Sequence, residues 1–394
     1  MTDKLSITLA QLNQSVGDIG GNAAQMLSVR EKAGKVDLVA FPEMQLIGYP
    51  AEDLVLKPSL IERAQAELER MAAITNDGGS AMLVGSVFVR DGALHNGVAL
   101  LDGGRISAVR FKHELPNYGT FDEKRLFAPG PLPEPVAFRG AMLGLPICED
   151  IWHPDVCRHL ADFGAGMFVC INGSPYEIEK DVLRIEGVAK RRAADTGLPL
   201  AYLNRIGGQD ELVFDGASFV VNGDGRLAVQ MVDWEEQITR TNWTRTARGW
   251  NCDRGDIATL ADHPEDVYCA MVLSLRDYVN KNGFPGVVLG MSGGIDSAAC
   301  AAIAVDALGP DRVWCVMLPS RYTSQESLDD ARACAEALGC RYSTIPIQPA
   351  VAGFEEMLAP EFAATKPDVT EENLQSRIRG VTLMALSNKF GPML

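Results

Sequence analysis

The sequence lacks the features that mark membrane and secreted proteins. No apolar run reaches the roughly 18 residues that a membrane-spanning helix needs. The first residues, MTDKLSITLAQLNQ, lack the basic segment, apolar stretch and small-residue cleavage site of a signal peptide. Internal repeats and low-complexity segments are also missing. We therefore expect a cytoplasmic globular protein with no membrane partner.

Basic residues are scarce relative to acidic ones. The chain of 394 residues has 36 Lys and Arg against 52 Asp and Glu, a formal net charge of −16. Because contacts to a phosphate backbone need a positive surface, we expect no nucleic-acid partner. Small anionic substrates remain open, since a single pocket can be positive on an acidic protein.

Metal-ligand spacing of cysteines is also absent. The 9 cysteines form an odd set with no C-x-x-C pair. In a long intracellular chain, most of them are expected to be buried small apolar residues rather than disulfide partners.

The chain contains two halves that differ in how their apolar runs and helical stretches alternate. Residues 1–245 alternate short apolar runs with amphipathic stretches such as residues 60–76 and 181–197, which predicts a layered α/β domain. Alternation alone leaves the strand order and sheet pairing open. Residues 246–265 lack a strong period and carry Gly, Asp and Pro, so we place a linker there.

Residues 266–394 form the second expected domain. A helix is expected at 266–282, followed by the apolar runs GVVLGM, WCVMLPS and YSTIPIQ with helical stretches between them. This strand–helix order predicts a doubly wound parallel sheet with right-handed crossovers, which binds ligands at the carboxyl ends of its strands.

A glycine-rich loop lies between the first of these strands and its helix, and consists of Met291-Ser292-Gly293-Gly294-Ile295-Asp296-Ser297. The glycines allow close approach of a ligand, and the helix N-terminus with the two serine hydroxyls makes an anion cradle. Asp296 is suited to Mg²⁺ carried with phosphates. The loop lacks the lysine of a G-x-x-x-x-G-K-[ST] motif. The alternative is a plain glycine turn with a serine cap.

The loop resembles the pyrophosphate loop of enzymes that cleave ATP between its α and β phosphates. Two further segments, residues 318–324 (LPSRYTS) and 372–379 (ENLQSRIR), resemble NAD synthetases. The resemblance implies that the whole loop, Leu318 and Arg321 bind ATP. It implies that Asn373, Gln375 and Arg377 contact the nucleotide substrate. The alternative for Arg321, Arg377 and Arg379 is an ordinary solvated surface.

Three segments of the first half each place a reactive side chain just after an apolar run. They are Glu43 in FPEM, Lys112 in FKHELP and Cys148 in PICED. A thiol that attacks an amide needs a base for its proton and a positive group or N–H donors for the oxyanion. Each residue alone has a plainer explanation, since a lone cysteine is more often an inert core residue and a lone lysine a surface charge.

Together the three resemble the carbon–nitrogen hydrolase (nitrilase) superfamily, whose triad is Glu, Lys and Cys in this order. That resemblance implies an α-β-β-α layered domain. Residues 112–125 and 147–152 are most similar to the glutaminase domain of NAD synthetases. The similarity to this glutaminase domain implies that Cys148 forms a γ-glutamyl thioester, that Glu43 acts as base and then acid, and that Lys112 stabilises the oxyanion.

Glutamine also carries an ammonium and a carboxylate, so its pocket needs charged and hydroxyl partners. We assign Tyr118, Glu149 and Ser174 to glutamine binding. Glu149 has a competing structural role as partner of an arginine in the wall. Tyr49 either lines the entrance or is a core aromatic at a turn.

The combined resemblance implies a glutamine-dependent NAD synthetase family member that takes glutamine, ATP and deamido-NAD and uses Mg²⁺. Members of this family are homo-oligomers, and their synthetase domain extends well beyond the position that corresponds to Leu394, so the second domain is expected to be incomplete. One alternative is a stand-alone amidase with a nucleotide-sensing C-terminal half. Others are a different ATP-dependent amidotransferase, which SGGIDS alone would allow, and a non-catalytic scaffold.

Overall fold

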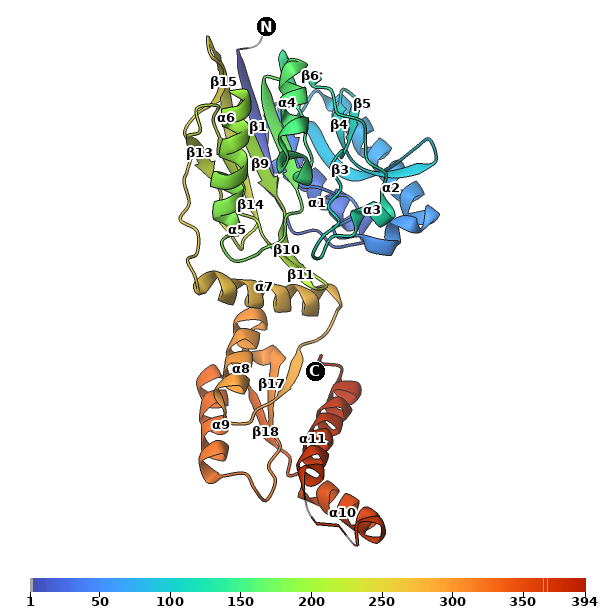
Figure 1. The fold of residues 1–394 in the computed structure, drawn as a ribbon, viewed down its shortest axis with the longest axis vertical. Helices are drawn as coiled ribbons and strands as arrows, with labels where there is room; N and C mark the ends of the chain where they lie inside the picture. Colours follow the sequence, from blue (N-terminus) through green and yellow to red (C-terminus); the bar gives the residue numbers. More distant parts are fainter. Residues whose placement is uncertain (1–2, 364, 367) are drawn as a thin grey trace. The chain divides into compact units, whose positions relative to one another are not determined.

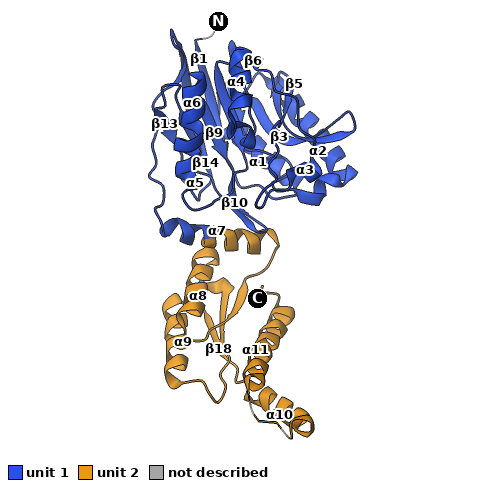
Figure 2. Cartoon of the chain, viewed as in Figure 1, with its two compact units in different colours: residues 1–270 blue, residues 271–394 orange. Residues whose placement is uncertain are grey.

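The computed structural model describes residues 3–363, 365–366 and 368–394. The chain divides into two compact units, Met1–Ala270 and Met271–Leu394, drawn in different colours in Figure 2. Among the described residues, none of the helices combines the length and the apolar composition that crossing a bilayer requires.

Two large sheets organise the first unit (Figure 1). The first sheet has the order β15-β14-β1-β2-β3-β4-β5, with bounds Gly249–Cys252, Gln237–Thr246, Lys4–Gln11, Leu38–Ala40, Ala81–Arg90, Ala93–Asp102 and Arg105–Phe111. The second has the order β13-β12-β9-β8-β7-β6, with bounds Leu227–Gln230, Phe219–Val221, Leu200–Asn204, Met167–Asn172, Ala141–Gly144 and Val136–Phe138. A separate hairpin joins β10 (Ile206–Gln209) and β11 (Leu212–Asp215).

The central strands of both sheets are buried on both faces, and alternate residues enter different cores. Leu5, Ile7 and Leu9 of β1 pack against apolar residues of the second sheet, whereas Ala10 joins the core under α1 (Ile19–Lys32) and α2 (Pro58–Ile74). The outer face of the second sheet is covered by α4 (Pro154–Asp162) and α6 (Lys190–Thr196). The unit therefore has the predicted α-β-β-α layers, each sheet carrying apolar residues on two faces.

The helical stretch expected at residues 181–197 is a composite. It begins with α5 (Lys180–Val182), continues as a π-helix over Leu183–Ala189 and ends in α6. Shorter elements are α3 (Glu123–Leu126) and 3-10 turns at Glu52–Leu56, Thr75–Asp77, Cys148–Ile151 and Pro310–Arg312. π-helical segments inside helices are often found at functional positions.

Part of the region set apart as a linker lies in the first sheet. Strand β15 falls within residues 246–265 and pairs with β14, with Trp243 opposite Cys252. The following helix, α7 (Glu265–Lys281), agrees with the helix expected at 266–282.

The second unit contains three parallel strands in the order β16-β17-β18, with bounds Val287–Gly290, Val313–Met317 and Arg341–Thr344. The connecting helices are α8 (Ile295–Leu308) and α9 (Gln325–Leu338), followed by α10 (Gln348–Phe362) and α11 (Val369–Phe390). Val287 packs with residues of α8 and α9, and Val288 packs with residues of α10 and α11. The sheet is thus covered on both faces, as the strand–helix alternation predicts.

Candidate active site

The site of the first unit forms where strand ends of the two sheets meet. Glu43 follows β2 of the first sheet, and its side chain is fully buried. Its Oε1 accepts hydrogen bonds from Asn96 Nδ2 at 2.7 Å and Lys112 Nζ at 2.8 Å. Its Oε2 accepts one from the backbone N–H of Gly173, which follows β8 of the second sheet, at 2.7 Å. In the described part of the chain no other hydrogen bond to Oε2 is present.

Lys112 follows β5 and lies between two carboxylates. Its Nζ donates to Glu43 Oε1 at 2.8 Å and to Glu123 Oε1 at 3.0 Å, with no side-chain exposure. Burial alone would lower the pKa of Lys112, but the charges of Glu123 and Glu43 hold it well above its usual value. The lysine is therefore a permanent cation whose side chain is shielded from solvent.

Glu123 is a member of this cluster that the sequence analysis did not assign. It is the first residue of α3, and its Oε1 also accepts a hydrogen bond from the Tyr49 hydroxyl at 3.0 Å. Burial raises the pKa of Glu123 to about 7 against the lowering effect of Lys112. In the sequence it is one acid within a polar stretch, and nothing there distinguishes it from a solvated residue.

Cys148 begins the 3-10 turn that follows β7 of the second sheet. Its backbone has φ +47°, in the left-handed region that costs an ordinary residue about 1–2 kcal/mol. Burial and the charge of Glu43 raise the pKa of the Cys148 thiol well above its usual value, while Lys112 lowers it. The thiol is therefore protonated at rest, and its reaction as a nucleophile requires a base.

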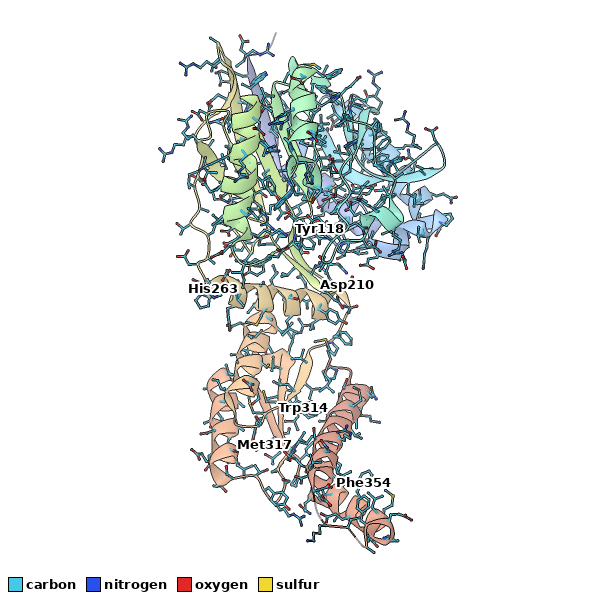
Figure 3. The ribbon with its side chains drawn as sticks, viewed as in Figure 1. Tyr118, Asp210, His263, Trp314, Met317 and Phe354 are labelled. Carbon is cyan, nitrogen blue, oxygen red and sulfur yellow. The ribbon has the colours of Figure 1, made fainter. Side chains whose placement is uncertain are left out.

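Tyr118 and Glu149 form a pair next to the cysteine. The Tyr118 hydroxyl donates to the Glu149 carboxylate, at 3.0 Å from Oε1 and 2.9 Å from Oε2. Glu149 also has His153 Nε2 at 3.8 Å, so among the described residues its side-chain partners are Tyr118 and His153 and not an arginine of the wall. Tyr118, labelled in Figure 3, is 56% exposed, whereas Glu149 is buried. The pair thus joins the buried site to the solvent.

Ser174 lies in a tightly held segment after β8. Arg184, in the π-helix, donates to Ser174 Oγ at 3.2 Å, to Ser174 O at 2.8 Å and to Pro175 O at 2.8 Å. Arg184 is itself paired with Asp215 at 2.6 Å, and both are buried. Since the neighbouring Gly173 donates a hydrogen bond to Glu43, this network also supports the Glu43 carboxylate.

A cavity of about 110 Å³ borders Glu123 and Tyr49. Tyr49 is 4% exposed and packs edge-on against Phe214, with ring centroids 6.2 Å apart. The tyrosine is therefore a core aromatic whose hydroxyl reaches the charged cluster through Glu123.

The glycine loop of the second unit has the geometry of an anion site. Ser292 Oγ and Ser297 Oγ are 3.0 Å apart, and Gly294 N–H donates to Ser292 Oγ at 3.2 Å. Gly293 has φ +82°, and a Cβ there would lie 2.4 Å from Ser327 O, so only glycine fits. Gly294 caps α8, which directs the helix N-terminus toward the loop.

A cavity of about 480 Å³ adjoins this loop. Its lining includes Ser292, Leu318, Tyr322 and Arg379, together with Met317, which ends β17 and is labelled in Figure 3. Arg379 Nε donates to Leu318 O at 3.0 Å. The cavity therefore combines hydroxyls, backbone N–H groups and a cation at the carboxyl ends of parallel strands.

The remaining expected contacts lie elsewhere on this unit. Arg321 pairs with Glu355 at 3.1 Å and does not line this cavity. Along α11, Asn373 and Arg377 are exposed, whereas Gln375 is buried and donates to Glu371 O at 3.4 Å. Of the two arginines at the end of the ENLQSRIR segment, Arg379 is the one that lines the cavity.

Asp296 and Ile295 lie in the first turn of α8 and are both exposed. Among residues 3–363, 365–366 and 368–394, no three His, Cys, Asp or Glu side chains cluster as a metal site. Mg²⁺ is commonly held by one or two carboxylates plus substrate phosphates, so a single aspartate beside an anion loop suits this ion.

Comparison with known proteins assigns a family to each half of the chain. The carbon–nitrogen hydrolase family matches residues 6–248, and the NAD synthase family matches residues 267–394. The glutamine-dependent NAD(+) synthetase of Rhodobacter capsulatus is 50% identical over 100% of this chain and 71% of its own length. That of Acinetobacter baylyi is 40% identical over 98% of this chain and 71% of its length.

A solved structure agrees with these sequence matches. The glutamine-dependent NAD+ synthetase from Acinetobacter baumannii, in complex with ADP, superposes with a TM-score of 0.93 at 38% identity, covering 99% of this chain and 73% of that one. With a hydrolase domain, an NAD synthase region and relatives of this similarity, the chain belongs to the glutamine-dependent NAD(+) synthetases.

Proposed function

We propose that the first unit hydrolyses glutamine through a thioester on Cys148. The observation that carries this proposal is the buried ion pair of Lys112 with Glu43, 2.8 Å apart, beside a buried thiol whose pKa responds to both charges. A base, a fixed cation and a protonated nucleophile in one enclosed site are the three groups that amide cleavage requires.

The steps follow from these positions. Glu43 takes the thiol proton on Oε2 as the Cys148 sulfur attacks the side-chain carbonyl carbon of glutamine. Lys112 stabilises the oxyanion. Collapse of this intermediate breaks the C–N bond, and Glu43 returns the proton to the departing nitrogen, which leaves as ammonia. Glu43 then activates a water molecule that cleaves the thioester to glutamate and free thiol.

Glutamine recognition is assigned to the residues around the cysteine. Glu149 supplies the negative charge for the α-ammonium group, and its hydrogen bond with Tyr118 orients the carboxylate. Ser174 supplies a hydroxyl whose position is set by Arg184. Charge-assisted bonds of this kind discriminate glutamine from neutral amides.

The second unit is assigned to ATP. Ser292, Leu318 and Arg379 line the cavity of about 480 Å³. The nucleotide binds there, and the rest of the loop to Ser297 binds its phosphates. Asp296 would hold Mg²⁺ together with the phosphates, and the ion would supply charge neutralisation there. Arg321, Asn373, Gln375 and Arg377 remain proposed nucleotide contacts.

The two activities combine in one amidation. The carboxylate of deamido-NAD attacks the α-phosphorus of ATP. This step releases pyrophosphate and forms an acyl-adenylate. Ammonia from glutamine then displaces AMP and forms the carboxamide of NAD. We further propose that the protein acts in the cytoplasm and that it is a homo-oligomer. Sedimentation would test the oligomeric state.

The experiment is NAD formation from deamido-NAD, ATP and Mg²⁺ with either glutamine or ammonium, for the wild type and Cys148→Ala. We expect the wild type to use both nitrogen sources and the variant only ammonium. Use of glutamine by the variant would refute the role of Cys148. Glutamine hydrolysis without ATP consumption under either condition would instead favour the amidase alternative.

A further inference from the structure

Asp150 is a buried carboxylate that none of the steps above uses. It has no solvent exposure and lies two residues after Cys148. Its Oδ2 accepts a hydrogen bond from the N–H of Ile147 at 2.9 Å. Its Oδ1 accepts two more, from the N–H of His113 at 3.0 Å and of Glu114 at 2.8 Å.

These three donors belong to two different loops. Ile147 directly precedes Cys148 in the turn after β7 of the second sheet. His113 and Glu114 directly follow Lys112 after β5 of the first sheet, 37 and 36 residues away from Asp150 in sequence. A single carboxylate therefore connects the loop that carries the cation to the loop that carries the thiol.

A local capping role accounts for only part of this arrangement. An acid at the third position of a helical turn often bonds back to the N–H before the turn, which explains the bond from Ile147. Capping does not require the bonds from His113 and Glu114, which come from the opposite sheet. Burying a charge is costly unless its oxygens are well bonded, and here both oxygens are directed at catalytic loops.

We propose that Asp150 is a positioning residue that fixes Lys112 relative to Cys148, so that the ammonium meets the oxyanion that forms on the glutamine carbonyl oxygen when the sulfur attacks. This inference rests on the proposed function of the first unit. The left-handed backbone of Cys148 adds to the need, because a strained turn keeps its shape only when its surroundings hold it. Displacing a reacting group by about 1 Å can reduce a rate by about 100-fold.

The test is Asp150→Asn in the full chain, assayed by glutamate release. Asparagine preserves size, but its NH₂ group must face at least one backbone N–H in place of an acceptor oxygen. We expect kcat to fall roughly 10- to 100-fold while KM for glutamine stays within about threefold, since binding is assigned to other residues. The matched control is Asp155→Asn, which removes an exposed charge nearby and should leave both constants unchanged.

Thermal unfolding of each variant separates positioning from folding. A kcat that stays within threefold of wild type overturns the inference, and so does a loss that merely tracks the folded fraction or that appears equally in KM. If Asp150→Asn does not fold, the smaller Asp150→Ser is measured by the same criteria. Absence of glutamate release by the wild type would refute the proposed function itself, and the inference with it.

Discussion

Replacing Lys112 with methionine would show how strongly the buried charges depend on one another. Methionine is unbranched and apolar, so it fills most of the same space and the main effect is loss of charge. In the wild type, Lys112 Nζ lies 2.8 Å from Glu43 Oε1 and 3.0 Å from Glu123 Oε1. Without the lysine, these two carboxylates would be buried together with no cation between them. Removing one partner of a buried ion pair costs about 3–5 kcal/mol. We expect that loss in the unfolding free energy of the first unit.

The loss should depend on pH in a defined direction. Burial raises the pKa of Glu123 to about 7 in the wild type while Lys112 lowers it, so without the lysine this pKa rises further. A carboxyl whose folded pKa is raised contributes stability below its unfolded value of 4.5 and loses it as the pH rises through the folded value. The deficit of Lys112→Met should therefore be small near pH 4.5 and grow through pH 7 and above.

The assay is urea unfolding followed by tryptophan fluorescence in a Trp314→Phe background. Trp314 is the one tryptophan of the 5 that belongs to the second unit, so the signal then reports on the first. Lys124→Met, which alters an exposed lysine beside Glu123, is the control. A deficit below about 1 kcal/mol, equal to the control or independent of pH, would refute the electrostatic account.

Two further predictions concern Arg184 and Gly293. Arg184→Ala should lower the first unit's unfolding free energy by about 3–5 kcal/mol in the same urea assay and raise KM for glutamine, and adding Asp215→Asn should restore part of the stability because the orphaned charge is gone. Gly293→Ala should abolish binding of a non-hydrolysable ATP analogue in calorimetry, because the new Cβ would lie 2.4 Å from Ser327 O. Glutamine hydrolysis by that variant should be unchanged; unaltered analogue binding would show that the loop is not the nucleotide site.

Several parts of the site could be predicted from local sequence. Glu43, Lys112 and Cys148 each follow a short apolar run, and reactive residues at strand ends are an ordinary feature of α/β proteins. The glycine loop was predictable for a similar reason, since its strand, two glycines and helix are adjacent in the chain. In the structure Lys112 donates a hydrogen bond to Glu43, and Gly294 of the loop is the N-cap residue of α8.

The rest depends on contacts between distant segments. Glu123 lies in a one-turn helix without any periodic signal, and Arg184 lies in a stretch whose many charges suggest a solvated helix. Arg184 is buried because Asp215, on the β10–β11 hairpin, pairs with it. Sheet pairing was likewise open, so the approach of Gly173 from the second sheet to Glu43 could not be foreseen.

Every step proposed for the first unit passes through a γ-glutamyl group on Cys148. Mass spectrometry detects this group in protein that is acid-quenched during glutamine turnover and digested to separate its cysteine peptides. We expect the mass of one γ-glutamyl group on the Cys148 peptide, absent in Cys148→Ala and undiminished in Cys157→Ala. A γ-glutamyl group on another residue, or continued glutamate release by Cys148→Ala, would contradict it.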